Sequence, residues 1–334
     1  MSQLHTRRAL AAAGLGAAAL LAVTACSSGG GESSDGGASS DEAVKIGVLQ
    51  FVQHPALDSA TEGFKSALED AGVSAEYDDQ NAQGEVPNTN TIASTFASDD
   101  LDLVFTVATP AAQAAAQAIV DIPVLFTAVT DAEAAGLVDS NDAPGANVTG
   151  TSDLNPVADQ MELLAEIAPD AKKVGIVYSS GEVNSEVQVE LAKDAAADLG
   201  LTIEEATVSN SAEVQQAAQS LDDVDAFYVP TDNIVVSGVA ALIQVAEQQQ
   251  IPVVSGDSGP VEEGAVATLG LDYTKLGYQT GEMAVQILQD GADPAEMAVE
   301  TSNDVSLIIN PAAAERMGVT LPDAVVDRAD QVIE

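Results

Sequence analysis

The chain contains one sequence pattern twice, and this repeat restricts the possible folds more than any other feature. The tetrapeptide KIGV at 45–48 matches KVGI at 173–176, and each lysine is followed 27 residues later by a glycine, Gly72 or Gly200. Three matches in the same order along the chain predict two lobes of the same topology. The two further matches are FTVAT at 105–109 with FYVPT at 227–231, and IPV at 122–124 with IPV at 251–253.

Strand-like and helix-like segments alternate in the first half of the chain. Such βαβ alternation predicts a parallel sheet with helices on both faces. We therefore expect an α/β protein made of two doubly wound parallel-sheet lobes joined by a multi-strand hinge. The expected strands are 44–49, 74–77, 103–107 and 124–126, and the expected helices are 55–71, 88–97 and 109–120.

The chain is expected to cross between the lobes more than once. Residues 144–156 are rich in Gly, Asn and Pro and suit a first crossing, and a second is expected near 270–273. A helix over 274–289 would return to the first lobe, and a strand over 305–309 to the second. A few connecting residues can absorb the rotation of a hinge. The predicted lobes are 43–152 with 273–300, and 153–272 with 301–334.

The N-terminus has the pattern of a lipoprotein signal. Arg7 and Arg8 precede an uncharged run at 9–22, which is the length of a signal-peptide core and short for a membrane span. Cys26 follows small residues and precedes a Gly/Ser-rich stretch. We expect a signal peptide at 1–25, lipidation of Cys26, a flexible tether at 26–42, and a location on the extracytoplasmic face of the cell membrane. The pattern leaves the general and twin-arginine export routes open.

Charge and composition exclude several classes of partner. The chain has 10 Lys and Arg against 53 Asp and Glu, a formal net charge of -43, which argues against nucleic acid as a partner. Cys26 is the only cysteine, and His54 is the only histidine after the predicted signal peptide. Neither a disulfide within the chain nor a Cys- or His-based metal site is therefore expected. We expect a monomer without a cofactor.

Ligands of open parallel sheets bind beyond the carboxyl ends of the strands. The loops expected there are rich in Thr, Ser, Asn and Asp. Thr109, Ser185 and Asp232 each begin a helix, so the neighbouring N–H groups either hold a ligand carboxylate or are capped in the ordinary way. His54 either bonds the ligand or fixes its loop. The residues that could hold an ammonium group are Asp131, Asp232 and Asp257, of which we expect at most one or two to do so.

Several of these loops resemble one known family. The segments are QHPALD at 53–58, ATPAA at 108–112, TD at 130–131, NVTG at 147–150, NS at 184–185 and TDN at 231–233. In this order they resemble the ABC-transporter substrate-binding proteins of the tryptophan-binding TrpX type.

The resemblance implies a type I periplasmic-binding-protein fold, an importer made of a permease and an ATPase, and a small-molecule ligand. Some members of the family bind aromatic amino acids. The family often has Asp-Pro where this chain has Asp131-Ala132, so this loop departs from the pattern. The pocket residues that the resemblance implies are Gln50, His54, Thr109, Thr130, Asn184, Ser185 and Asp232.

Other functions fit the sequence less well. GDSG at 256–259 resembles the nucleophile motif of chymotrypsin-like proteases, with His54 and Asp102 preceding it in the right order. Those enzymes are β-barrels, however, and a triad is defined by geometry, so we expect no enzyme. Binders that serve a signalling receptor, or that take a nucleoside, sugar or amide, remain alternatives. With no Trp, 5 Tyr and 6 Phe, the chain offers few rings for stacking on a sugar.

Overall fold

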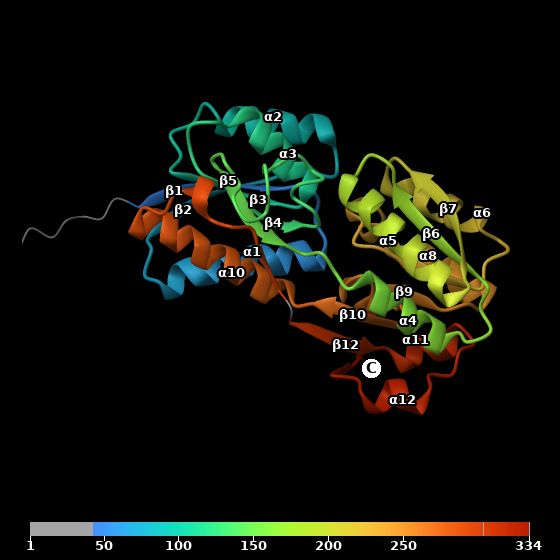
Figure 1. The fold of residues 1–334 in the computed structure, drawn as a ribbon. Helices are drawn as coiled ribbons and strands as arrows, with labels where there is room; N and C mark the ends of the chain where they lie inside the picture. Colours follow the sequence, from blue (N-terminus) through green and yellow to red (C-terminus); the bar gives the residue numbers. More distant parts are fainter. Residues whose placement is uncertain (1–42, 303, 334) are drawn as a thin grey trace, which may run out of the picture. The chain divides into compact units, whose positions relative to one another are not determined.

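Figure 1 shows the computed structural model of the chain, which describes residues 43–302 and 304–333. The predicted signal peptide at 1–25, the tether at 26–42 and the lipidation site Cys26 lie outside the described residues. No helix within the described ranges is long and apolar enough to cross a membrane.

The first sheet has six parallel strands in the order β11-β5-β4-β3-β1-β2. In Figure 1, α2 and α3 lie on one side of this sheet, and α1 and α10 lie on the other. The strands are β1 (Val44–Gln50), β2 (Ala75–Asn81), β3 (Leu103–Val107), β4 (Val124–Val129), β5 (Val148–Ser152) and β11 (Glu300–Thr301), and the helices are α1 (Pro55–Asp70), α2 (Val86–Phe96), α3 (Thr109–Ala118) and α10 (Tyr273–Val285).

The second sheet has seven strands in the order β13-β12-β10-β9-β8-β6-β7, and every pair is parallel except β10 with β12. The strands are β6 (Lys173–Ser179), β7 (Thr202–Val208), β8 (Ala226–Val229), β9 (Val253–Ser255), β10 (Ala267–Leu271), β12 (Val305–Ile309) and β13 (Gln331–Val332). The helices of this half are α4 (Val157–Ile167), α5 (Val183–Leu199), α6 (Val214–Ser220), α7 (Asn233–Val236), α8 (Val239–Gln249), α9 (Gly259–Glu262), α11 (Pro311–Arg316) and α12 (Asp323–Asp327).

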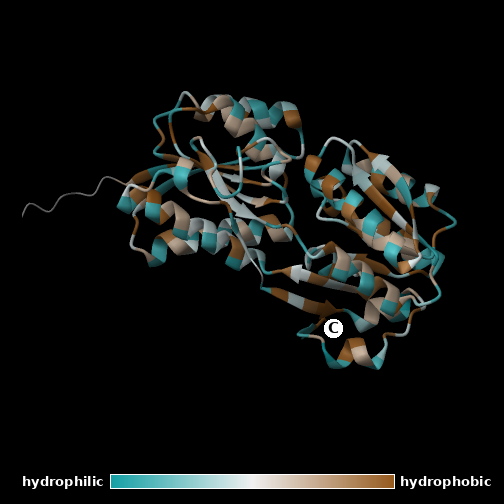
Figure 2. Ribbon diagram, in the orientation of Figure 1, coloured by the Kyte–Doolittle hydropathy of each residue, from teal (hydrophilic) through white to brown (hydrophobic). Residues whose placement is uncertain are grey.

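The predicted fold class is confirmed: the strands β2-β1-β3-β4-β5 of the first sheet correspond in order to β7-β6-β8-β9-β10 of the second. The chain passes between the sheets after β5, after β10 and after β11. One feature differs from a purely parallel arrangement, because β12 enters the second sheet from the first and runs antiparallel to β10. In Figure 2 the helices carry both hydrophobic and hydrophilic residues, as helices that cover a sheet do.

The repeat extends to the contacts that begin each lobe. The backbone N–H of Lys45 donates to the Asp102 carboxylate at 2.8 Å, and the N–H of Lys173 donates to Asp225 at 2.9 Å. Asp102 thus lies at the amino ends of β1 and β3, whereas His54 follows the carboxyl end of β1. The two residues lie at opposite ends of the sheet, which rules out the protease-like triad.

Candidate ligand-binding site

A small cavity lies where loops from the carboxyl ends of strands in both sheets meet. Its volume of about 10 Å³ leaves room for about one water molecule. Loops of the first sheet, loops of the second sheet and the segments that connect the sheets all contribute to its wall. The lining residues are His54, Leu57, Ala128 and Thr130 from the first half, Asn184, Thr231, Asn233, Val236 and Asp257 from the second, and Asp153 and Tyr273 from the connections.

His54 is the residue immediately before α1, and the side chain of Asn233 lies close enough to its imidazole to interact with it. Burial lowers the pKa of His54 to about 4, so its imidazole is neutral at neutral pH. The Nδ1 atom is enclosed and has no hydrogen-bond partner.

Two more buried polar atoms in this region lack a partner. They are Oγ1 of Thr109 and Oδ1 of Asn184. Thr109 is the first residue of α3 and does not line the cavity. The strand before it, β3, lies between the strands whose end loops carry His54 and Thr130. A buried polar group without a partner costs about 1–3 kcal/mol. Among the described residues only Gln249 has another such side-chain atom, so these costs are concentrated at predicted site residues.

The backbone before α3 is strained at the same place. Ala108 has φ 83° and ψ 153°, a conformation that only glycine adopts readily. Ala128, at the end of the neighbouring β4, also has a positive φ, of 55°. Strain of this kind costs on the order of 1–3 kcal/mol and is found mainly at functional sites. Both residues lie at the strand ends that surround the cavity.

Two buried carboxyl groups line the cavity. Burial raises the pKa of Asp257 to about 7, although the backbone N–H of Gly259 donates to this carboxyl at 2.8 Å. Burial also raises the pKa of Asp153, which accepts hydrogen bonds from Tyr273 Oη at 2.7 Å and Thr130 Oγ1 at 3.2 Å. The carboxyl oxygens of Asp153 and Asp257 are therefore acceptors to which an ammonium group in the cavity could donate.

A second buried carboxyl pair lies just behind the wall of the cavity. Asp232 accepts from the N–H of Ser179 at 2.6 Å, the hydroxyl of Ser185 at 2.7 Å and the N–H of Val235 at 2.7 Å. These contacts make it the N-cap of α7, and neither Asp232 nor Ser185 lines the cavity. Burial and the nearby Asp232 raise the pKa of Glu182.

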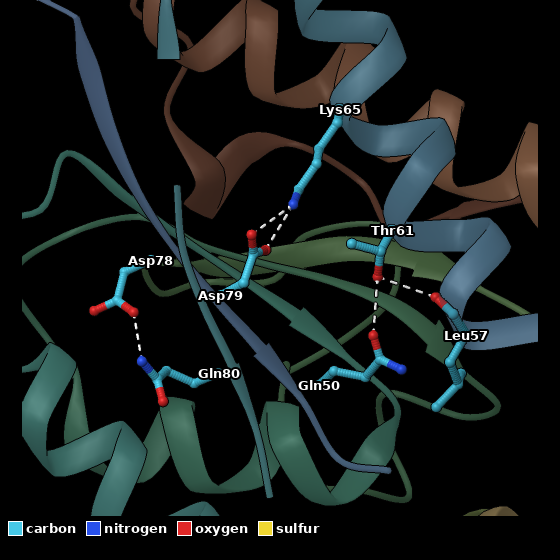
Figure 3. A network of polar contacts seen from close by, with 7 residues as sticks. All are labelled: Gln50, Leu57, Thr61, Lys65, Asp78, Asp79 and Gln80. Carbon is cyan, nitrogen blue, oxygen red and sulfur yellow. Dashed lines mark hydrogen bonds and ion pairs between the residues drawn. The ribbon is translucent and has the colours of Figure 1, made fainter. Parts of the chain in front are cut away.

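Gln50 and Asp131 are also away from the cavity wall. The amide nitrogen of Gln50 donates to Asp58 at 2.8 Å, and its amide oxygen accepts from Thr61 at 3.3 Å, as Figure 3 shows for the second contact. Gln50 thus ties the end of β1 to α1. Asp131 accepts from the N–H of Ala134 at 2.9 Å and closes the turn after β4.

The described residues contain no cluster of His, Cys, Asp and Glu side chains that could hold a metal ion. The geometry is that of a polar cavity between two α/β lobes, with unpartnered hydrogen-bonding atoms on both sides.

Comparison with known proteins identifies the family. The family described as "ABC transporter substrate binding protein" matches residues 45–333. The chain belongs to this family. It is 44% identical over 276 residues to a tyrosine-binding protein of Clostridioides difficile, covering 81% of this chain and 80% of that protein.

Two solved structures are similar over nearly the whole described chain. One is the ABC domain from Streptococcus pneumonia in complex with L-Trp, with 38% identity, a TM-score of 0.84, and coverage of 87% of this chain and 100% of that one. The other is a ligand-free, open substrate-binding protein with adhesive properties from Clostridium difficile, with 45% identity, a TM-score of 0.66, and coverage of 87% and 99%. The type I periplasmic-binding-protein fold expected from the sequence is confirmed.

The cavity of this substrate-binding protein contains residues that sequence reasoning missed. Asp153 and Tyr273 lie in segments that were interpreted only as crossings between the lobes. The sequence indicates Asn233 only as part of its loop segment, and it does not single out Glu182, which lies behind the cavity wall. The clearest signal for Asp153 and Tyr273 was their position, because a crossing segment of a two-lobed protein passes beside the cleft.

Proposed function

We propose that this protein binds an aromatic amino acid between its lobes and delivers it, as a lipid-anchored extracytoplasmic monomer, to the permease of an ABC importer. The main observation in favour is that unpartnered polar atoms from both lobes gather around one cavity. A ligand that supplied their partners would remove a cost of about 1–3 kcal/mol for each atom. The tyrosine-binding relative and the structure with bound L-Trp support the choice of ligand.

Each part of an aromatic amino acid has a matching feature in the site. Thr109 Oγ1 and the positive end of the α3 dipole suit the carboxylate. Asp153 and Asp257 suit the ammonium group. Leu57 and Val236 offer apolar surface for the ring, together with Tyr273, a residue that is 5% exposed.

Hinge closure follows from the size of the cavity. Small-molecule pockets are about 300–1,000 Å³, far more than the cavity of about 10 Å³. The lobes must therefore separate to admit an amino acid and then close on it. The higher TM-score with the L-Trp complex than with the open structure, despite lower sequence identity, supports a closed arrangement here. The ligand can favour closure only by its differential affinity for the closed state.

Titration calorimetry with L-Tyr, L-Trp, a sugar and a nucleoside tests the ligand class. Thr109→Val should weaken the binding of L-Tyr by about tenfold to a hundredfold, because a hydrogen bond to a charged group contributes about 1.5–3 kcal/mol. Tyramine, which lacks the carboxylate, should bind Thr109→Val and the unmodified protein alike. Thr91→Val, on the exposed face of α2, is the matched control. Tight binding of a sugar in place of amino acids would overturn the proposal.

Mass spectrometry of the N-terminal peptide tests the lipid anchor. Protein isolated from its membrane should begin at Cys26 and carry a diacylglyceryl group on it. Two acyl chains are expected because one chain alone anchors a protein only weakly. Cys26→Ser should carry no lipid, whereas Ser27→Ala should be lipidated as before. An unmodified Cys26 in membrane-bound protein would contradict the proposed anchor.

A further inference from the structure

Glu182, the residue before α5, is buried and surrounded by N–H donors. Its Oε2 accepts from the side-chain amide of Asn184 at 3.1 Å and from that of Asn233 at 2.5 Å. The backbone N–H groups of Asn233 and Ile234 also donate to Glu182, at 3.3 Å and 3.2 Å. Only 3% of the residue is exposed. One carboxyl thus fixes the orientation of two asparagine side chains that line the cavity.

The contact with Glu182 determines which atom of the Asn184 side-chain amide remains without a partner. A side-chain amide donates through its nitrogen and accepts through its oxygen. Because Nδ2 of Asn184 donates to Glu182, and also to the carbonyl of Thr231 at 3.3 Å, the oxygen is left over. This Oδ1 atom is buried and unpartnered. Asn184 therefore presents an acceptor to whatever occupies the cavity.

The orientation of the Asn233 amide in turn determines which atom faces the imidazole of His54. Nδ2 of Asn233 donates to Glu182, so Oδ1 is the atom available to accept from the imidazole. The side chain of Asn233 lies close enough to the His54 ring to interact with it. Since Nδ1 has no partner and only an acceptor atom of Asn233 is left, we infer that Nε2 carries the hydrogen and faces this oxygen. In the neutral ring Nδ1 then carries a lone pair and is an acceptor.

We propose that Glu182 is a positioning residue that makes this part of the cavity a double acceptor, formed by Asn184 Oδ1 and His54 Nδ1. The ligand would supply a hydrogen-bond donor to these two atoms, either its ammonium group or the hydroxyl or ring N–H of its side chain. The ligand class rests on the proposed function. The orientation of Asn184, Asn233 and His54 rests only on the contacts within the protein.

Nitrogen NMR of the imidazole tests the orientation without any ligand. The signal of His54 is identified by its absence from a His54→Gln variant, since His5 is the only other histidine. We expect a neutral ring with hydrogen on Nε2 and none on Nδ1. Hydrogen on Nδ1 in the ligand-free protein would overturn the proposal. Glu182→Gln replaces an acceptor oxygen by a donor, so it should change the tautomer populations, whereas the exposed Glu186→Gln should not.

Binding measurements with three ligands separate a positioning role from a structural one. They are L-Tyr, L-Phe and 3-(4-hydroxyphenyl)propionate, which lacks the ammonium group. If the ammonium is the donor, Glu182→Gln should weaken the binding of L-Tyr and L-Phe about tenfold or more and leave the binding of the propionate unchanged. If the phenol is the donor, Glu182→Gln should weaken the binding of L-Tyr and of the propionate and leave the binding of L-Phe unchanged. Equal loss for all three, or no loss, would overturn the proposal.

Asn184→Leu provides a second variant in case Glu182→Gln does not fold. It removes one acceptor and should reproduce the same ligand-dependent loss. If the unmodified protein binds none of the three ligands, the proposed function fails, and the tautomer of His54 alone then decides this inference.

Discussion

Gly277→Ala should lower the free energy of unfolding by about 3 kcal/mol or more. A Cβ atom at Gly277 in α10 would lie 1.8 Å from the carbonyl oxygen of Ala60 in α1, closer than any side chain approaches a backbone atom. Overpacking a core costs about 1–3 kcal/mol when side chains can move, and here the obstacle is backbone. The cost must also exceed the gain of about 1 kcal/mol from replacing Gly by Ala within a helix.

The same helix pair has two more close approaches. A Cβ atom at Gly63 would lie 2.0 Å from the oxygen of Thr274, and one at Gly281 would lie 2.5 Å from Cβ of Ala67. The helix α10 follows β10 of the second sheet but packs on α1 of the first half. These glycines therefore hold the second crossing in place, and their substitution should affect the hinge as well as stability.

Chemical denaturation followed by circular dichroism measures the effect. Gly181→Ala is the matched control, because its added Cβ would meet only Ser179 Oγ at 3.8 Å. The control should change stability by less than about 1 kcal/mol. Gly277→Ala with the stability of the unmodified protein would show that α1 and α10 can move apart at little cost.

The fold was predictable because buried parallel strands and amphipathic helices leave clear patterns. The expected strand over 305–309 and the strand over 103–107 have the same bounds in the structure. The strand expected at 74–77 extends in the structure as β2 (Ala75–Asn81), since its polar second half lies at the sheet edge and lacks a hydrophobic pattern. The antiparallel direction of β12 depends on a path between lobes, which local patterns do not encode.

The candidate site was predictable only where it follows strand ends. His54, Thr130, Asn184 and Asp257 do line the cavity, because the rule for parallel sheets selects those loops. The rule does not tell which residues of a loop turn inward. Asp232 caps α7 instead, a role that sequence reasoning had left open.

Residues that act through other residues were beyond sequence reasoning. Glu182 touches the cavity through Asn184 and Asn233, and this chain of contacts exists only after two separate loops have folded together. Asp153 and Tyr273 meet across two different crossings, 120 residues apart in the chain. Neither set of contacts produces a pattern in the nearby sequence.

Asp257→Asn should reduce the loss of stability that the ligand-free protein shows as the pH rises. Burial raises the pKa of Asp257 from 3.8 to about 7. Between pH 4 and 7 the folded state therefore holds a proton that the unfolded state has released. Stability from this group is complete below about pH 4 and is lost as the pH rises through 7, with a slope of up to about 1.4 kcal/mol per pH unit.

The unfolding free energy at several pH values between about 3.5 and 8, which spans the two pKa values of Asp257, measures this slope. Asp257→Asn cannot ionise, so its slope should be smaller by about 1 kcal/mol per pH unit near pH 5–6. The free energy of unfolding of the variant should exceed that of the unmodified protein most at the upper end of the pH range. Glu186→Gln removes one exposed carboxylate and controls for net charge. Parallel curves for Asp257→Asn and the unmodified protein would mean that Asp257 is hydrated and ionised, and that the lobes do not enclose it without ligand.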